Sequence, residues 1–208
     1  GNPMAYRLGD DVHNIEAIQV EVETDGEPIS RTVHMTHLGP VVVGETSPWN
    51  DQYVYAMRDV NYENYRSGDQ YKDINSARNV TELREALATH QGAAFVNTIA
   101  ADADGGALYA DMSAIPNVSS ELIERCAVDT QNGQRAITLN GSDPSCNWQI
   151  DSRAAYPGLM PPTEQPSLIT DTYVSNSNDS YWLSNPDNPL EGFSPIIGNE
   201  QQTRSLRT

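Results

Sequence analysis

The sequence predicts a mixed α+β protein whose sheets are mostly antiparallel. Residues 15–37 alternate between apolar and polar side chains on both sides of a tight-turn pair, a pattern typical of a β-hairpin. Residues 79–92 instead place apolar side chains at helical spacing behind a residue that can cap a helix. Long loops rich in Asn, Gly and Pro separate the regular segments. Together these observations favour the α+β class.

Strands dominate the first part of the chain, and residues 1–50 are expected to form a β-rich subdomain. Apolar side chains occupy every second position of residues 18–22, and Asp25-Gly26 supplies the chemistry of a hairpin turn. Residues 41–43 form a short apolar run that suits a buried strand. The strand segments predicted here are residues 15–23, 29–35, 41–43 and 53–57.

Residues 51–208 are expected to form a second part, in which helices precede further strands. Residues 61–77 are polar with scattered aromatic side chains and are predicted to be helical. Asn79 can cap another helix, because Glu82 lies three positions later as in a capping box, and Gly92 is expected to end that helix. Further strands are predicted at residues 95–101, 107–112 and 172–175, around a loop-rich stretch from residue 116 to residue 166.

The chain is strongly acidic. Against 29 acidic residues it has only 12 basic ones, which gives a formal net charge of −17. A surface of this sign repels phosphates, and this argues against nucleic acid or an anionic membrane as a partner. No apolar run is long enough to span a bilayer. Neither end reads as a natural terminus, so the chain is expected to be an internal piece of a longer protein.

The chain has two cysteines, Cys126 and Cys146, and the residues between them are rich in turn formers. A disulfide between them would stabilise the fold by roughly 3 kcal/mol in the chain-entropy model. It would also indicate an oxidising compartment. The spacing is equally consistent with two free thiols. Zinc binding and thioredoxin chemistry are disfavoured, because no Cys-x-x-Cys spacing occurs.

One acidic motif resembles the start of a calcium-binding loop. Asp102, Asp104 and Gly106 have the spacing of its first ligands. The position that should supply a bidentate glutamate is occupied by Ser113, which cannot chelate a metal in this way. A hairpin turn between two strands therefore explains the motif better than a metal site.

No motif for nucleophilic catalysis is present. A Gly-x-Ser-x-Gly elbow and a His-Glu-x-x-His helix are both absent from the sequence. The histidines do not pair with a Ser or Cys in a recognisable arrangement, and structural or surface roles are expected for His13, His34, His37 and His90. A stand-alone hydrolase with a Ser/His/Asp triad assembled by the fold stays an alternative.

A run of small polar side chains, residues 176–179, follows the last predicted strand. Such residues bond to the local backbone and build rigid turns. A neutral amide such as that of Asn178 can also present a fixed N–H donor to a substrate oxygen, as an oxyanion hole requires. On these residues alone, a structural turn is the simpler interpretation.

The segment Asn-Ser-Asn-Asp-Ser-Tyr-Trp-Leu at residues 176–183 resembles a motif in the β-subunit of penicillin-acylase-type N-terminal-nucleophile hydrolases. The branch that it resembles most contains the acyl-homoserine-lactone and aculeacin acylases. Other stretches match this family in the same order, so the resemblance spans nearly the whole chain. These stretches are residues 37–42, 56–59, 61–64, 95–102, 106–109 and 190–195.

The resemblance implies part of a four-layer αββα fold, a small β subdomain, and a mechanism. A precursor cuts itself to expose a serine, whose hydroxyl attacks an amide carbonyl while its own α-amine takes the proton. Asn178 would be the side-chain donor of the oxyanion hole. Arg204 would orient the site, with Arg207 as the alternative. Tyr71 and Phe95 would line the acyl pocket, and both are smaller than the tryptophans expected there.

The resemblance also implies the setting of the site. It favours a Cys126–Cys146 disulfide in a periplasmic or secreted bacterial enzyme. The expected partners are the rest of the β-subunit, the α-subunit of the same precursor, and a small N-acyl substrate such as an acyl-homoserine lactone, a penicillin or a lipopeptide. No cofactor is expected, although calcium in the whole enzyme stays open near residues 185–188.

The nucleophilic serine of the family does not open this chain, which begins with Gly1. The isolated chain is therefore expected to be inactive, while the whole protein would hydrolyse linear amides. The alternative from another functional class is a non-catalytic binding module that reuses the same scaffold.

Overall fold

The computed structural model describes residues 2–45, 47–94, 96–128 and 137–198, and the chain divides into two compact units. The first, here called the N-terminal unit, contains Gly1–Asp59 and Leu122–Asn147. The second, the core unit, contains Val60–Glu121 and Trp148–Thr208. The grouping of 122–147 with the N-terminal strands has no signal in the sequence pattern. The expected division at residues 50 and 51 stays a prediction.

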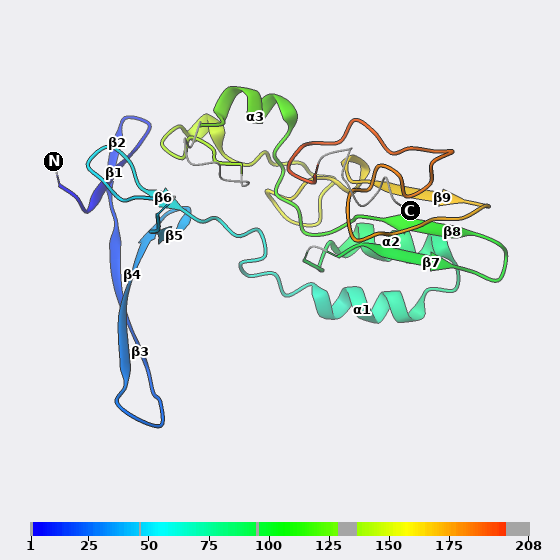
Figure 1. Cartoon of the computed structure of the whole chain (residues 1–208), viewed down its shortest axis with the longest axis horizontal. Helices are drawn as coiled ribbons and strands as arrows, with labels where there is room; N and C mark the ends of the chain where they lie inside the picture. Colours follow the sequence, from blue (N-terminus) through cyan, green and yellow to red (C-terminus); the bar gives the residue numbers. More distant parts are fainter. Residues whose placement is uncertain (1, 46, 95, 129–136, 199–208) are drawn as a thin grey trace. The chain divides into compact units, whose positions relative to one another are not determined.

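The N-terminal unit is built on an antiparallel sheet with the strand order β3-β4-β5-β6 (Figure 1). Strands β1 and β2 pair separately. The predicted hairpin is confirmed, because β3 and β4 pair along the whole length of β3 with Val22 opposite Ile29. The strands are β1 (Ala5–Leu8), β2 (Asp11–Asn14), β3 (Glu16–Val22), β4 (Ile29–Thr36), β5 (Gly39–Val42) and β6 (Tyr55–Ala56).

Most apolar side chains of the hairpin lie on one face, which also carries Glu16 and Arg31. Ile18 lies opposite Val33, and Val22 lies opposite Ile29, so these side chains share a face. They remain open to solvent, with Val22 55% exposed. Residues 41 and 42 do lie in a strand, but the expectation that this strand is buried is wrong. Val43 is 63% exposed, because every strand of this small sheet is only half-buried or exposed.

A disulfide closes the second segment of the N-terminal unit. It joins Cys126, at the end of α3 (Ser120–Cys126), to Cys146, at the end of the 3-10 turn η1 (Pro144–Cys146), with 5.6 Å between their Cα atoms. The backbone N–H of Gly9 donates to the carbonyl of Ser142 at 2.7 Å, which ties this segment to the β1–β2 hairpin. Helix α3 lies in a stretch that was predicted to be loop.

The core unit contains a three-stranded antiparallel sheet in the order β7-β8-β9, with helices on one face (Figure 1). Its strands are β7 (Thr98–Ala101), β8 (Ala107–Ala110) and β9 (Ser167–Thr170). Helix α2 packs on β8, and α1 (Ser67–Ser76) packs beside α2 (Val80–His90). The apolar core between them consists of Val80, Leu87, Leu108, Ala110 and Met112. Within the described residues, no helix is long and apolar enough to cross a membrane.

Two predicted elements of the core unit need correction. The last strand is not at residues 172–175 but at Ser167–Thr170, where it pairs with β8. The Thr170 hydroxyl accepts the N–H of Thr172 at 3.3 Å, so a local turn forms where a strand was expected. Residues 61–66 are not helical either. The Asn64 side-chain amide instead donates to Asn61 Oδ1 within a turn and to the carbonyl of Gly92.

Helix α2 begins as predicted and ends earlier than predicted. The Asn79 side chain accepts the N–H of Glu82 at 2.8 Å, which is half of a capping box. The other half is replaced, because the Glu82 carboxylate accepts from the backbone and guanidinium of Arg78. The helix ends at His90, and Gln91 takes the left-handed conformation with φ 43°. Gly92 is needed for packing, since a Cβ there would lie 2.6 Å from the Arg66 carbonyl carbon.

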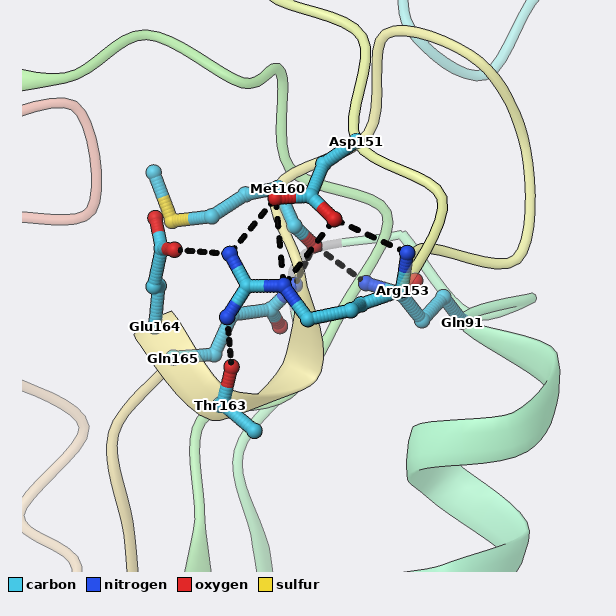
Figure 2. A network of polar contacts seen from close by, with 7 residues as sticks. All are labelled: Gln91, Asp151, Arg153, Met160, Thr163, Glu164 and Gln165. Atoms are coloured by element: carbon cyan, nitrogen blue, oxygen red, sulfur yellow. Dashed lines mark hydrogen bonds and ion pairs between the residues drawn. The ribbon is translucent and has the colours of Figure 1, made fainter.

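The loop from Asp151 to Gln165 is held by two buried glutamines and by exposed ion pairs of Arg153 (Figure 2). Gln91 donates from Nε2 to the Met160 carbonyl at 2.7 Å, and its Oε1 accepts the N–H of Ala155 at 2.9 Å. Gln165 donates to the same carbonyl at 2.9 Å. Arg153 bridges Asp151 and Glu164, and it lowers the pKa of Asp151 to about 2. The predicted loop is therefore ordered.

Candidate functional site

The segment that carries Asn178 is an ordered loop after β9. Its two arms are joined by a backbone hydrogen bond of 2.7 Å from Ser175 N–H to the Ser184 carbonyl. Asn185 is fully buried and donates its side-chain amide to the Tyr173 carbonyl at 3.0 Å. These bonds fix the base of the loop, so its tip can hold a defined shape.

Asn178 lies at the exposed tip of this loop in the left-handed conformation, with φ 54°. Its backbone N–H donates to Oδ1 of Asn176 at 2.9 Å, which forms an Asx turn. Asparagine tolerates this conformation better than most residues, so the strain is small. The turn fixes the backbone from which the Asn178 amide projects.

Aromatic side chains support the loop from below. Tyr181 is only 1% exposed, and its ring meets the Phe193 ring edge-on at a centroid distance of 5.3 Å. Trp182 donates its indole N–H to Glu191 at 3.3 Å. The loop is therefore supported by a small apolar contact between Tyr181 and Phe193.

A second set of polar groups connects the loop to the sheet. Asn97 precedes β7 and donates from Nδ2 to the Tyr109 hydroxyl at 3.0 Å and to Asn176 Oδ1 at 3.5 Å. Tyr109 lies on β8 and is 1% exposed. Since Leu108 and Ala110 face the helices, alternation along the strand places Tyr109 on the opposite face of the sheet. The Asn178 loop is thereby linked to that face.

Burial raises the pKa values of two acidic groups at this end of β8. Burial raises the pKa of the Asp111 carboxyl to about 6. Burial, followed by the charges of Asp111 and Tyr181, also raises the pKa of the Tyr109 phenol above its ordinary value. This end of β8 therefore presents little negative charge in mildly acidic solution.

The other residues predicted for the site are not brought together with Asn178 in the described part of the chain. Tyr71 lies on α1 with 55% of its side chain exposed. Phe95, Arg204 and Arg207 lie outside the described residues. The acyl pocket and the orienting arginine therefore stay predictions. A shallow hollow between α1 and α2 is lined by Asp73, Ser76, Ala77, Glu82, Glu85, Ala86 and Thr89, whose carboxylates do not suit an acyl chain.

Residues that could hold a metal do not gather in the described ranges, where no group of three or more His, Cys, Asp or Glu side chains is suitably placed. Asp102 instead accepts backbone N–H groups from Val80 at 3.1 Å, Asp104 at 3.1 Å and Gly106 at 2.8 Å, and these bonds lower its pKa. Near residues 185–188, Asn185 Oδ1 accepts the N–H of Asp187 at 2.8 Å. Calcium near residues 185–188 of the whole enzyme stays a prediction.

Sequence reasoning did not identify Asn97, Tyr109 or Asn176 as neighbours of one another. Asn97 and Asn176 lie 79 positions apart, and no motif spacing connects them. The register of the sheet places the start of β7 level with the start of β9, because Thr98 and Ser167 both pair with Ala110. The residues after β9 must therefore run back past the sheet to bring Asn176 to Asn97. A local sequence pattern does not encode this return.

Comparison with known sequences gives a match over the whole chain. The sequence model of the penicillin amidase family matches residues 1–208. The acyl-homoserine lactone acylase PvdQ of Pseudomonas fluorescens is 40% identical over 197 residues, which cover 93% of this chain and 25% of the relative. The aculeacin-A acylase of Actinoplanes utahensis is 41% identical over 215 residues, which cover 100% of this chain and 27% of the relative.

The chain thus spans about a quarter of the length of these curated relatives, 25% and 27%. Among solved structures, it resembles a thermostable penicillin G acylase from Alcaligenes faecalis with a TM-score of 0.64. That similarity covers 90% of this chain and 30% of the acylase chain at 18% identity. It establishes a likeness of fold, and the predicted α+β class with part of an N-terminal-nucleophile hydrolase fold is confirmed.

Proposed function

Because the chain belongs to the penicillin amidase family, we propose that it supplies the oxyanion-binding amide of Asn178 to a longer acylase. The relatives described above are acylases. The reaction of the longer protein would be hydrolysis of the amide bond of an N-acyl compound. Attack on that amide turns its carbonyl oxygen into an anion, which needs hydrogen-bond donors placed in advance.

The fixed, exposed turn at Asn178 is the observation that carries this proposal. An effective oxyanion donor must be aimed before charge develops, because reorienting it during the reaction costs free energy. The N–H···Oδ1 bond to Asn176 fixes the backbone at φ 54°, and the residue lies at the solvent-facing tip of its loop. The side-chain amide of Asn178 is uncharged, and it can donate an N–H hydrogen bond to the oxyanion.

The remaining parts of the machinery would come both from this chain and from the rest of the longer protein. We propose an N-terminal serine, exposed by self-cleavage of a precursor into two subunits, as the nucleophile that forms the acyl-enzyme. Arg204, with Arg207 as the alternative, would orient the site. Tyr71 and Phe95 would contribute to the acyl pocket.

The names of the two relatives print an acyl-homoserine lactone and aculeacin A. We propose N-acyl compounds of this kind as substrates: acyl-homoserine lactones, penicillins or lipopeptides. The disulfide between Cys126 and Cys146 supports a periplasmic or secreted location, because such bonds persist in oxidising compartments.

Asn178→Ala in the full-length protein tests this function. Loss of one oxyanion donor should lower kcat by roughly 10²–10³-fold, or about 2.7–4 kcal/mol. The rate should be measured with an N-acyl-homoserine lactone and normalised to the fraction of correctly processed protein. Asn75→Ala, at an exposed position of α1, is the matched control and should retain the wild-type rate. An unchanged kcat in the Asn178 variant would exclude the proposed role.

A further inference from the structure

We infer that Asn97 and Tyr109 are positioning residues that hold the Asn178 turn on the β7-β8-β9 sheet through the side chain of Asn176. The inference rests on the proposed function, because it explains how the candidate oxyanion donor is kept in place. Neither residue is expected to touch the substrate.

The first link is the Asx turn itself. Asn176 Oδ1 accepts the N–H of Asn178 at 2.9 Å, so the position of the Asn176 amide sets the position of the Asn178 backbone. Asn176 is exposed, and an exposed side chain without a second partner would sample several rotamers. A second hydrogen bond to the same oxygen can hold the Asn176 side chain in a single rotamer.

Asn97 supplies that second bond. Its Nδ2 donates to Asn176 Oδ1 at 3.5 Å and to the Tyr109 hydroxyl at 3.0 Å. An amide nitrogen has two hydrogens, and an amide oxygen has two lone pairs, so both bonds at each group can form together. The 3.5 Å bond is the longest and weakest of the three hydrogen bonds that connect Asn178 to Tyr109.

Tyr109 is the fixed end of this series of hydrogen bonds. It lies on the central strand of the sheet, between Ile99 of β7 and Leu168 of β9, and is 1% exposed. A buried side chain on a strand that is paired on both sides has little freedom to move. Burial also raises the pKa of its phenol, so the hydroxyl keeps its proton across the working pH range of an enzyme.

The three side chains that would hold the Asn178 turn are uncharged, which suits a position near an oxyanion. Tyr109, Asn97 and Asn176 are all neutral, so they add no negative charge near the site where the oxyanion develops. A carboxylate at position 97 could not donate to Asn176 Oδ1, and its charge would oppose the developing anion. This difference between an amide and an isosteric carboxylate provides a test.

The experiment measures kcat and KM of the full-length protein for Tyr109→Phe, Asn97→Ala and Asn97→Asp, alone and combined with Asn178→Ala. Each single variant should lower kcat about 5–30-fold while KM changes by less than about 3-fold, as expected when contacting residues are coupled. Asn97→Asp should lose at least as much as Asn97→Ala. In the Asn178→Ala background the same changes should reduce kcat by less than about 2-fold.

Tyr65→Phe, at a tyrosine that is 85% exposed, is the control for loss of a phenol hydroxyl and should leave kcat unchanged. Equal losses with and without the Asn178 side chain would overturn the inference, as would unchanged kcat in both Asn97 variants. An unchanged kcat in Asn178→Ala alone would instead refute the proposed function. If Asn97→Ala fails to fold, Tyr109→Phe keeps the packed ring and carries the test.

Discussion

At the scale of single residues, the Asp111 carboxyl, directly after β8, has a pKa perturbed by burial. Burial raises its pKa to about 6, and the charge of Asp111 in turn helps raise the pKa of Tyr109. An acid with a raised pKa favours folding most when it is protonated. Its contribution is complete below the unfolded value of about 3.9 and is lost as the pH rises through about 6.

Asp111→Asn should therefore stabilise the protein at neutral pH, because the amide imitates the protonated carboxyl. A shift of about two pKa units corresponds to at most about 3 kcal/mol. The Tm of the variant should exceed that of the wild type at pH 8, and the difference should vanish near pH 4. A Tm difference of the same size at both pH values would contradict this explanation.

The same scale shows how far single residues could be predicted. Asn178 was identified through a family motif, and the structure places it in a defined turn. Its supports, Asn97 and Tyr109, look like ordinary strand residues in the sequence. Their roles arise from hydrogen bonds across the sheet, which local patterns of side chains do not encode.

At the scale of elements, α2 depends on its amino-terminal cap. Asn79→Ala removes the acceptor for the Glu82 N–H and should destabilise the protein by about 1 kcal/mol. Asn79→Ser retains an acceptor and should recover most of that loss. Denaturant unfolding of the three proteins would measure the differences. Equal losses in Ala and Ser variants would show that the cap bond contributes little.

The disulfide joins the end of α3 to the end of η1 in the N-terminal unit. Replacing both Cys126 and Cys146 by serine should lower the unfolding free energy by roughly 3 kcal/mol. Because the bond lies outside the core unit, Asn178-dependent catalysis by the folded protein should change little. Unfolding with and without a reductant provides the comparison. A wild-type Tm that is insensitive to reductant would argue against the bond.

Elements with a strong local signal were predicted, and elements that depend on distant partners were not. The β3–β4 hairpin combines alternation with turn chemistry, and α2 combines a cap with an apolar stripe. The missed strand β9 has only four residues, without alternation of apolar and polar side chains, and it is stabilised by pairing with buried β8. Helix α3 is short and carries Cys126 into the disulfide, so tertiary contacts outweigh its weak periodicity.

At the scale of the whole molecule, stability is expected to differ between the two units. Strand β8 is completely buried in its sheet, whereas every residue of β3 is exposed. Amide hydrogen exchange should therefore be slower in peptides that cover β8 than in those that cover β3. Slow exchange throughout β3 would show that another surface covers the hairpin.

The exposed hairpin has a further consequence for how the protein behaves at high concentration. Strand β3 lies at the edge of its sheet, and such an edge can template a strand from another copy. Glu16 and Glu21 lie on this strand, and Glu23 follows it. Edge-to-edge pairing would bring these carboxylates together, so their repulsion opposes fibril growth at neutral pH. Without these carboxylates, the exposed apolar side chains of the hairpin would become a site for aggregation.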